Sequence, residues 1–415
     1  MNGAGDYVLY WMTAYRRRHF NFALERAAFW AAELRKPLLI LEPLACRYPW
    51  ANARIHTFVM QGMRHNISEF KNSAATYYPF VERFPGEGRK LLSELGQHAC
   101  IVITDDFPAF EFPRWIASTA ERLPVLLEKV DSNGLFPMRA TNRVFKTASS
   151  FRTFLKKQPT PAMPVSDPLA DLDIPRLKLA PIRDETLSSL PSVIDRSVEP
   201  VTSMPGGAAA ARIRLQMFIS GNSVSSGLSP YLHFGHISAH EAYLKVITSR
   251  RAGTERFIDQ LTTWRELGFN MCALSSDYDQ YDSLPEWAKN TLAKHTVDAR
   301  PFLYSLEQFE AAATHDPVWN MAQTQLLTTG VIENRLRMLW GKKILEWSPT
   351  PNEALEIMIH LNNKYALDGR DPNSYSGIFW ILGRYDRPWG PERKIFGLIR
   401  YMSSQNTARK LSAAR

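Results

Sequence analysis

The chain has 415 residues, 45% of them hydrophobic and 12% aromatic, which is enough to build two or three buried cores. Its 50 basic and 41 acidic residues give a net charge of +9, which favours a polyanionic partner such as nucleic acid. The three cysteines have no metal-ligand spacing, so we expect neither disulfides nor a metal site. Because the sequence shows no signal peptide and no apolar run of about 18 residues, we expect a cytoplasmic protein without membrane contact.

Short apolar runs alternate with longer helical patterns over the first 130 residues. This alternation predicts a doubly wound parallel sheet, an α/β domain spanning residues 1–135. Such a sheet binds ligands at the carboxyl ends of its strands, near Trp11, Met12 or Asp105. The predicted strands are 7–12, 37–42, 100–106 and 123–128, and the predicted helices are 20–35 and 51–70.

Nine prolines between residues 159 and 205 predict an irregular connection, and we assign 136–207 to an interdomain linker. Beyond it the apolar spacing is helical, so residues 208–415 are expected to form an all-helical domain. The predicted helices are 209–219, 240–250, 254–274, 306–313, 321–346 and 351–367.

Seven of the eleven tryptophans lie after residue 260, together with many arginines, aspartates and asparagines. Tryptophan can be oxidised reversibly, so this mixture suits a redox site better than a hydrolytic one. The alternative is that these residues are ordinary core aromatics, because tryptophan is mostly buried in any helical domain.

Five blocks in the expected helical domain resemble, in order, the signature blocks of the photolyase/cryptochrome family, closest to class II cyclobutane pyrimidine dimer photolyases. The opening Tyr10-Trp11-Met12 also fits this resemblance. It implies FAD inside the helical domain, damaged DNA on a basic face, and an antenna chromophore, a folate or a deazaflavin, in the α/β domain. The blocks are 226–235, 314–320, 342–347, 367–373 and 399–402.

The resemblance also implies which residues hold FAD. Arg337 would pair with Asp368 beneath the flavin ring, as a buried arginine requires a carboxylate partner. Asn362 would lie near flavin N5, where its amide can accept or donate a hydrogen bond. The remaining matches are the phosphate turn at Ser225, Ser226, Gly227, Leu228 and Ser229, and the ribityl or ring contacts Asp371 and Asn373. A serine turn can equally be a helix cap, and Asp371 and Asn373 also favour Asx turns.

Trp340, Trp319 and Trp347 match the class II chain that relays an electron from the surface to the flavin. Trp340 and Trp347 are two helical turns apart, about 10.5 Å along the axis, which is also the spacing of core residues.

The substrate pocket is the part that departs from the family. Trp264, Met338 and Trp380 match residues that contact a flipped-out pyrimidine dimer, but Gln260 stands where the family has a catalytic glutamate. A glutamine can donate a hydrogen bond but cannot share a proton. Two functions therefore stay open: a monomeric enzyme that repairs dimers in damaged DNA, and a cryptochrome-like photoreceptor that keeps FAD and the tryptophan relay but not repair. A third reading is a flavin-binding relic with neither activity.

Overall fold

The computed structural model describes residues 1–178 and 185–412. Its contacts divide the chain into two compact units, one formed by Met1–Thr141 with Pro159–Thr262 and the other by Asn142–Gln158 with Thr263–Arg415. This division differs from the expected one, because four helices between residues 208 and 259 belong to the sheet-containing unit. A helix within the expected linker, α5 (Ala148–Leu155), belongs to the second unit.

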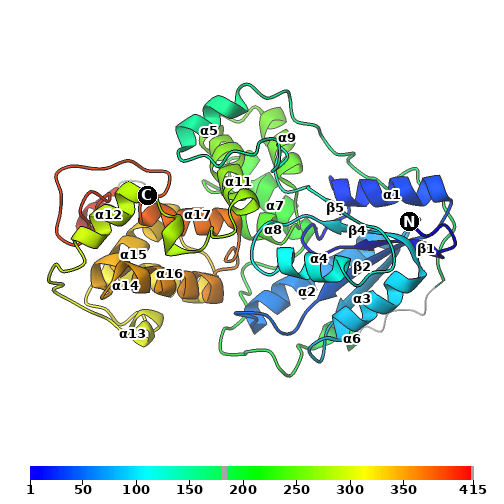
Figure 1. Ribbon diagram of the computed structural model, residues 1–415, viewed down its shortest axis with the longest axis horizontal. Coiled ribbons are helices and arrows are strands. Elements are labelled where there is room, and N and C mark those ends of the chain that lie inside the picture. The colour runs from blue at the N-terminus through cyan, green and yellow to red at the C-terminus, as the bar shows by residue number, and fades with distance from the viewer. Residues whose placement is uncertain (179–184, 413–415) are drawn as a thin grey trace. The chain divides into compact units, whose positions relative to one another are not determined.

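The first unit contains a five-stranded parallel sheet of order β3-β2-β1-β4-β5, which confirms the predicted α/β architecture. Helix α1 covers one face of this sheet, and α3 and α4 lie on the other (Figure 1). The sequence-based prediction missed β3, whose side chains are buried only at alternate positions and which contains Pro79. The strands are β1 (Tyr7–Trp11), β2 (Leu38–Leu44), β3 (Thr76–Val81), β4 (Ala99–Asp105) and β5 (Leu127–Val130).

Asp105, at the carboxyl end of β4, serves the fold. Its Oδ2 accepts the backbone N–H groups of Thr13, Ala14 and Tyr15 at 2.7–2.9 Å, and its Oδ1 accepts the hydroxyl of Tyr10 at 2.7 Å. Burial raises the pKa of Asp105, although these hydrogen bonds oppose the shift. Asp105, which was expected near a ligand, thus uses its carboxylate to hold the turn that follows β1.

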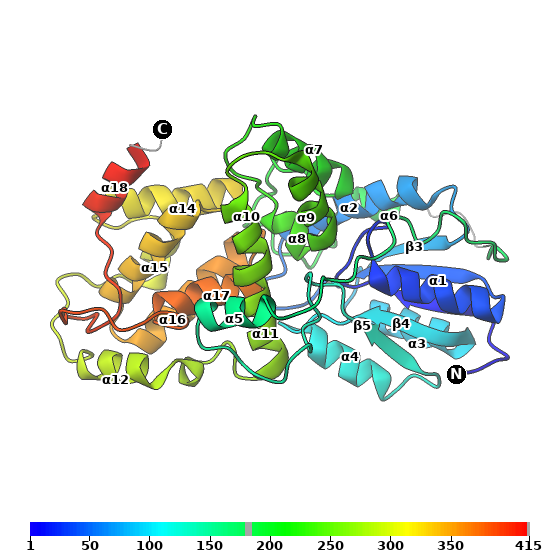
Figure 2. The same cartoon turned by 90° about the horizontal axis from the view of Figure 1, so that it is seen from above.

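The second unit is helical, with α15 at its centre in contact with α14, α16, α17 and α18 (Figure 2). Residues 321–346 were expected to form one helix, but they belong to two. Helix α14 ends at Thr329 and is followed by the cap residue Gly330, which adopts a left-handed φ of 69°. Glu333 caps the start of α15 by accepting two backbone N–H groups.

The remaining elements of both units are helices. In the first unit they are α1 (Phe22–Leu34), α2 (Ala53–Phe70), α3 (Glu87–His98), α4 (Phe112–Ala120), α6 (Glu185–Ser188), α7 (Ala208–Ile219), α8 (Ser229–His233), α9 (Ala239–Ser249) and α10 (Glu255–Asp259). A π-helix, η1 (Gln260–Trp264), follows α10. The second unit has α5, α11 (Arg265–Leu274), the 3₁₀-helix η2 (Tyr281–Ser283), α12 (Glu286–Lys294), α13 (Leu306–Glu310), α14 (Pro317–Thr329), α15 (Asn334–Trp347), α16 (Pro351–Tyr365), α17 (Pro372–Ile381) and α18 (Ser404–Ser412).

Within residues 1–178 and 185–412, no helix is both long enough and apolar enough to span a bilayer.

Candidate functional site

The serine turn expected to bind phosphate lies in the first unit and leads into α8. Gly227 adopts a left-handed φ of 59°, and a side chain there would crowd the guanidinium of Arg214, at 3.0 Å from its Nη1. Ser225 and Ser229 are exposed, Ser226 is half-buried, and Leu228 is buried and anchors the turn. The turn therefore presents hydroxyls to solvent beside a cation, an arrangement that suits an anionic group.

The pair expected to support a flavin ring forms in the second unit. Nη2 of Arg337, on α15, donates to both carboxylate oxygens of Asp368 at 3.1 and 3.2 Å. The Arg337 side chain is 17% exposed and that of Asp368 6%, so the ion pair is largely desolvated. Among the described residues, the other guanidinium nitrogens of Arg337 have no hydrogen-bond partner, which leaves donors for a ligand.

Asn362 lies near the end of α16, held by its amide nitrogen. Nδ2 donates to the hydroxyl of Ser374 at 2.7 Å and to Oδ1 of Asn363 at 3.2 Å. Oδ1 of Asn362 accepts no hydrogen bond from any described residue. The side chain is buried, so its free oxygen is ready to accept an N–H group from a bound ring.

Asp371 and Asn373 form the Asx turn that starts α17. Oδ1 of Asp371 accepts the backbone N–H of Asn373 at 2.9 Å, and Asp371 is the N-cap of the helix. The structural role foreseen for these two residues is therefore present, while their contact with a cofactor stays a prediction.

Three buried tryptophans form a chain through α14 and α15. Trp319 Nε1 donates to the backbone oxygen of Trp340 at 2.9 Å, and the rings of Trp319 and Trp347 lie 6.0 Å apart at 68°. Trp340 Nε1 in turn donates to Oε1 of Gln323 at 2.8 Å. The structure thus brings the three expected relay residues into one connected group.

Gln260 and Trp264 are the first and last residues of η1, a π-helical turn that the sequence did not predict. Such turns are rare and occur often at functional sites. Gln260 is exposed and Trp264 half-buried. Trp264 and Trp380 pack against the same apolar cluster, which includes Leu267 and Tyr385, so the structure brings these two expected substrate residues to a common support.

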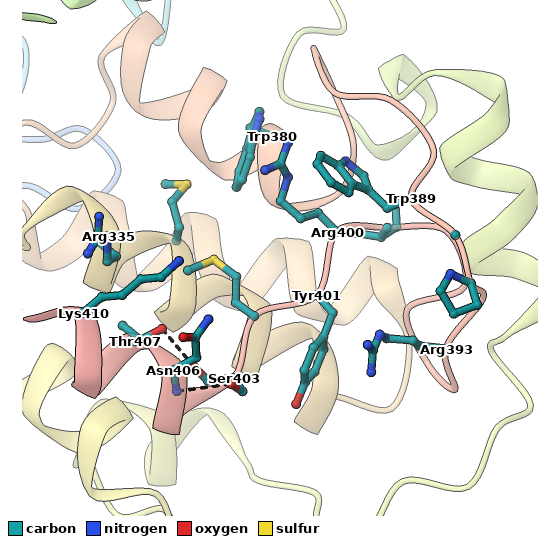
Figure 3. Close-up of a pocket in the computed structure, with 15 residues that line it drawn as sticks. Arg335, Trp380, Trp389, Arg393, Arg400, Tyr401, Ser403, Asn406, Thr407 and Lys410 are labelled. Atoms are coloured by element: carbon teal, nitrogen blue, oxygen red, sulfur yellow. Dashed lines mark hydrogen bonds between the residues drawn. The ribbon is translucent and has the colours of Figure 1, made fainter.

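A cavity of about 500 Å³ opens in the second unit beside Met338 and Trp380 (Figure 3). Its wall is a stack of aromatic rings and cations. The guanidinium of Arg400 lies 5.4 Å from the ring centroid of Trp380 and 3.9 Å from that of Trp389, and Arg387 lies over Trp389 at 4.3 Å. The other cations that line the cavity are Arg335, Arg393 and Lys410.

Asp386 fixes the stack. Its carboxylate accepts two hydrogen bonds from Arg400 at 3.0 and 3.1 Å and one from the indole of Trp389 at 3.1 Å. Burial alone would raise the pKa of Asp386, but these hydrogen bonds outweigh it and lower the pKa. The carboxylate therefore stays ionised and holds Arg400 and Trp389 in place.

Sequence reasoning did not assign Arg335, Trp389, Arg393, Arg400 or Lys410 to the site. The available signal was a tract after residue 380 in which arginines alternate with aromatics, a composition typical of nucleic-acid contacts. It could not show that the C-terminal helix α18 contributes to the same cavity.

Known proteins similar to this chain agree with the resemblance. A deoxyribodipyrimidine photo-lyase of Methanothermobacter thermautotrophicus is 34% identical over 98% of this chain and 92% of its own length. The photo-lyases of Potorous tridactylus and Arabidopsis thaliana are 32% and 31% identical, each over 98% of this chain and over 80% and 87% of their own lengths. No model of a protein family matches the sequence.

Solved structures show the same fold. A class III photolyase from Agrobacterium tumefaciens superposes with a TM-score of 0.73 at 15% identity, covering 99% of this chain and 85% of that one. A cryptochrome from Synechocystis superposes with a TM-score of 0.70 at 15% identity, covering 98% and 86%. With full-length relatives above 30% identity and this fold, the chain belongs to the photolyase/cryptochrome family.

Proposed function

We propose that this protein is a light-driven DNA repair enzyme that splits cyclobutane pyrimidine dimers and binds FAD as its cofactor. The observation that carries the repair activity is the cavity in which Trp380, Met338 and Arg400 meet a cluster of cations. An enzyme that turns two linked pyrimidines out of the duplex needs aromatic faces for the bases and cations for the phosphates.

The residues of the second unit fit a flavin ring. Arg337 has spare N–H donors, its charge is balanced by Asp368, and Asn362 has a free carbonyl oxygen. In the first unit, the serine turn with Arg214 fits an anionic group such as a phosphate. When bound and reduced, FAD supplies the electron that opens the dimer, and the protein holds and orients it.

The substrate residues would act by contact and hydrogen bonding. Trp264 and Trp380 offer aromatic faces against which an extruded dimer stacks, and Met338 fills the space beside Trp380. Gln260, exposed at the start of η1, would donate its amide N–H to a pyrimidine carbonyl. Proton supply at this position is not available from an amide.

The tryptophan chain would return the cofactor to its reduced state by relaying an electron to it. Trp340, Trp319 and Trp347 are buried, mutually connected and oxidisable, which supports this role.

Gln260 supports a second candidate, a blue-light photoreceptor that keeps FAD and the relay but has lost repair. An antenna chromophore in the first unit is compatible with either function. We expect the repair enzyme to act as a monomer on damaged DNA.

The deciding experiment is anaerobic repair of an oligonucleotide with one defined dimer under blue light, with a dark control. We expect repair by the wild type and a higher yield per absorbed photon for Gln260→Glu, because a carboxyl group can share a proton with the opening dimer. Binding to undamaged DNA should be the same for both, since phosphate contacts dominate it. If both proteins reduce FAD in the light yet neither repairs the dimer, the photoreceptor is the better account.

A further inference from the structure

We infer that Lys342, behind the aromatic wall of the cavity, acts through Trp380 as a positioning residue whose positive charge favours the entry of an electron into a dimer stacked on that ring. This inference rests on the proposed function, because only a repair enzyme places negative charge on bases in this cavity. It deepens that function by naming a source of electrostatic stabilisation at a site where Gln260 cannot supply a proton.

Lys342 lies directly behind the cavity wall. Its Nζ is 5.1 Å from the ring centroid of Trp380, a residue that lines the cavity (Figure 3). Lys342 itself is 0% exposed and does not line the cavity, so it can touch neither a base nor a phosphate. Nζ donates to the backbone oxygen of Ile381, which holds the amine beside the end of α17. Any effect of Lys342 on a ligand must therefore pass through Trp380.

A lysine at this place destabilises the fold. Among the residues that the structure describes, its amine has one hydrogen-bond acceptor, the backbone oxygen of Ile381, for three N–H groups. A methionine of similar length would pack there without the desolvation of a charge. Buried groups that weaken a fold are typical of functional sites. The functional feature in contact with Lys342 is the aromatic wall at Trp380.

Burial is the main influence on the charge of Lys342, and it lowers the pKa of the amine to about 7. Two charged side chains modify this effect. Asp386, in the loop after α17, favours the charged amine, and Arg400 opposes it. Because Arg400 also donates two hydrogen bonds to Asp386, these two charges largely offset each other. Lys342 therefore carries its charge below about pH 7 and loses it above that value.

Cations are distributed unevenly over the tryptophans of the second unit. The ring of Trp380 has two cations within 6 Å of its centroid, Lys342 at 5.1 Å and Arg400 at 5.4 Å. In the part of the chain that the structure describes, no cation stacks on Trp340 or Trp319. Positive charge hinders removal of an electron from a nearby ring and favours addition of one. Trp380 thus suits the support of a dimer that gains an electron, and the relay tryptophans suit electron loss.

The step that Lys342 would favour is balanced without a proton. One electron enters the dimer from the bound, reduced cofactor, both bonds that join the pyrimidines break, and the electron returns to the cofactor. The bases are negatively charged only between the first event and the last. A positive charge behind Trp380 lowers the energy of that state, because Coulomb attraction is strong where protein rather than water surrounds the charge. Lys342 keeps its proton throughout.

The test is the yield of dimer repair per absorbed photon between pH 6 and pH 9, with FAD chemically reduced under anaerobic conditions and all of the dimer-containing oligonucleotide bound. We expect the wild-type yield to fall by about 3-fold or more as the pH rises through 7, because Lys342 loses its charge. Lys342→Met should show the low yield at every pH. The matched control, Lys343→Met, removes the next lysine of α15, which pairs with Glu346, and should keep the wild-type profile.

Two further measurements do not depend on turnover. In protein isotope-labelled at lysine Cε, the NMR signal that is absent from Lys342→Met reports the protonation of Lys342, and its midpoint should coincide with that of the repair profile. Binding of the dimer-containing oligonucleotide in the dark should be equal in wild type and Lys342→Met, because Lys342 touches no ligand.

Equal repair yields for wild type and Lys342→Met at pH 6 overturn the inference. A yield that is lower in Lys342→Met by the same factor at every pH also overturns it, because lost packing against Trp380, unlike lost charge, does not depend on pH. Failure of the proposed function looks different: none of the three proteins, with FAD bound and reduced, would repair the dimer at any pH.

Discussion

At the scale of single residues, Lys342 is the most unusual group in the second unit. Its side chain is fully buried in α15, Nζ donates to the backbone oxygen of Ile381 at 2.5 Å, and it lies 5.1 Å from the ring centroid of Trp380. Burial lowers the pKa of Lys342 to about 7; Asp386 opposes this shift and Arg400 adds to it. Lys342 thus packs against Trp380 from the core of the unit. Burial of a charged amine at this place costs stability that an apolar side chain would not cost.

Lys342 makes the stability of the protein depend on pH. The unfolded chain binds a proton at this residue below about pH 10.5, whereas the folded protein binds it only below about pH 7. Stability should therefore rise with pH across this window, by up to ~1.4 kcal/mol per pH unit from this group, and show no change from it below pH 7. In Lys342→Met, which keeps the volume, the stability gained relative to wild type should be largest near pH 7 and shrink toward pH 10.

Urea unfolding of both proteins between pH 7 and pH 10 measures this difference. The matched control is Lys343→Met, which removes the neighbouring lysine that pairs with Glu346 but leaves Lys342 in place, and it should keep the wild-type slope. Parallel curves for wild type and Lys342→Met would show that Lys342 is protonated in the fold at all of these pH values.

Part of this site could be predicted from residue types, because some buried charged groups are stable only next to an opposite charge. A buried arginine needs a carboxylate, so pairing of Arg337 with Asp368 could be expected and is observed. The orientation of Asn362 could not, because it depends on Ser374, twelve residues further on. Asp386 and Arg400 were equally out of reach, since their pairing depends on how the loop after α17 folds back.

At the scale of elements, α11 and α17 approach each other closely at Gly268. A Cβ atom there would lie 2.7 Å from the backbone oxygen of Pro372 and 2.8 Å from the hydroxyl of Ser376. Pro372 is the first residue of α17 and follows Asp371. The contact therefore fixes where α17 begins, and with it the Asx turn and Trp380 near the end of the helix.

We expect Gly268→Ala to lower the midpoint of thermal unfolding. Overpacking against backbone typically costs about 1–3 kcal/mol, of which better helix propensity returns about 1 kcal/mol. Gly377→Ala, on α17, is the control: its Cβ would meet only Met338 Cε, at 3.9 Å, so the propensity gain should raise the midpoint. A midpoint for Gly268→Ala at or above that of wild type would contradict this prediction. It would mean that α17 can move away from α11 at little cost in stability.

Element prediction succeeded where periodicity was strong and failed where tertiary contacts decide. The strands β1, β2 and β4 and the helices α1 and α2 lie where apolar spacing placed them. The break at Gly330 was missed because the apolar pattern continues across it. The π-turn η1 has no sequence signature at all, although Gln260 and Trp264 were singled out through the family motif.

At the scale of the whole molecule, the excess of basic residues is partly concentrated. Four basic side chains line the cavity of the second unit: Arg335, Arg393, Arg400 and Lys410. Among the residues that the structure describes, Arg400 is the one cation lining the cavity that pairs with a carboxylate, that of Asp386. Positive charge is therefore clustered beside a cavity with aromatic walls, where it can attract the phosphates of a nucleic acid.

This concentration predicts how DNA binding depends on salt. Each phosphate contact contributes a slope of about −0.9 to the plot of log affinity against log salt concentration. If Arg393 and Lys410 contact phosphates, Arg393→Ala and Lys410→Ala should each weaken binding of undamaged duplex and reduce the slope by about 1, and the double variant by about 2. The control is Lys90→Ala on α3, an 81% exposed lysine of the first unit whose loss changes the net charge equally. Fluorescence anisotropy of a labelled duplex at several KCl concentrations gives the slopes. Because a general effect of net charge would act on all single variants alike, an equal loss of slope in Lys90→Ala would move the DNA-binding face away from this cavity.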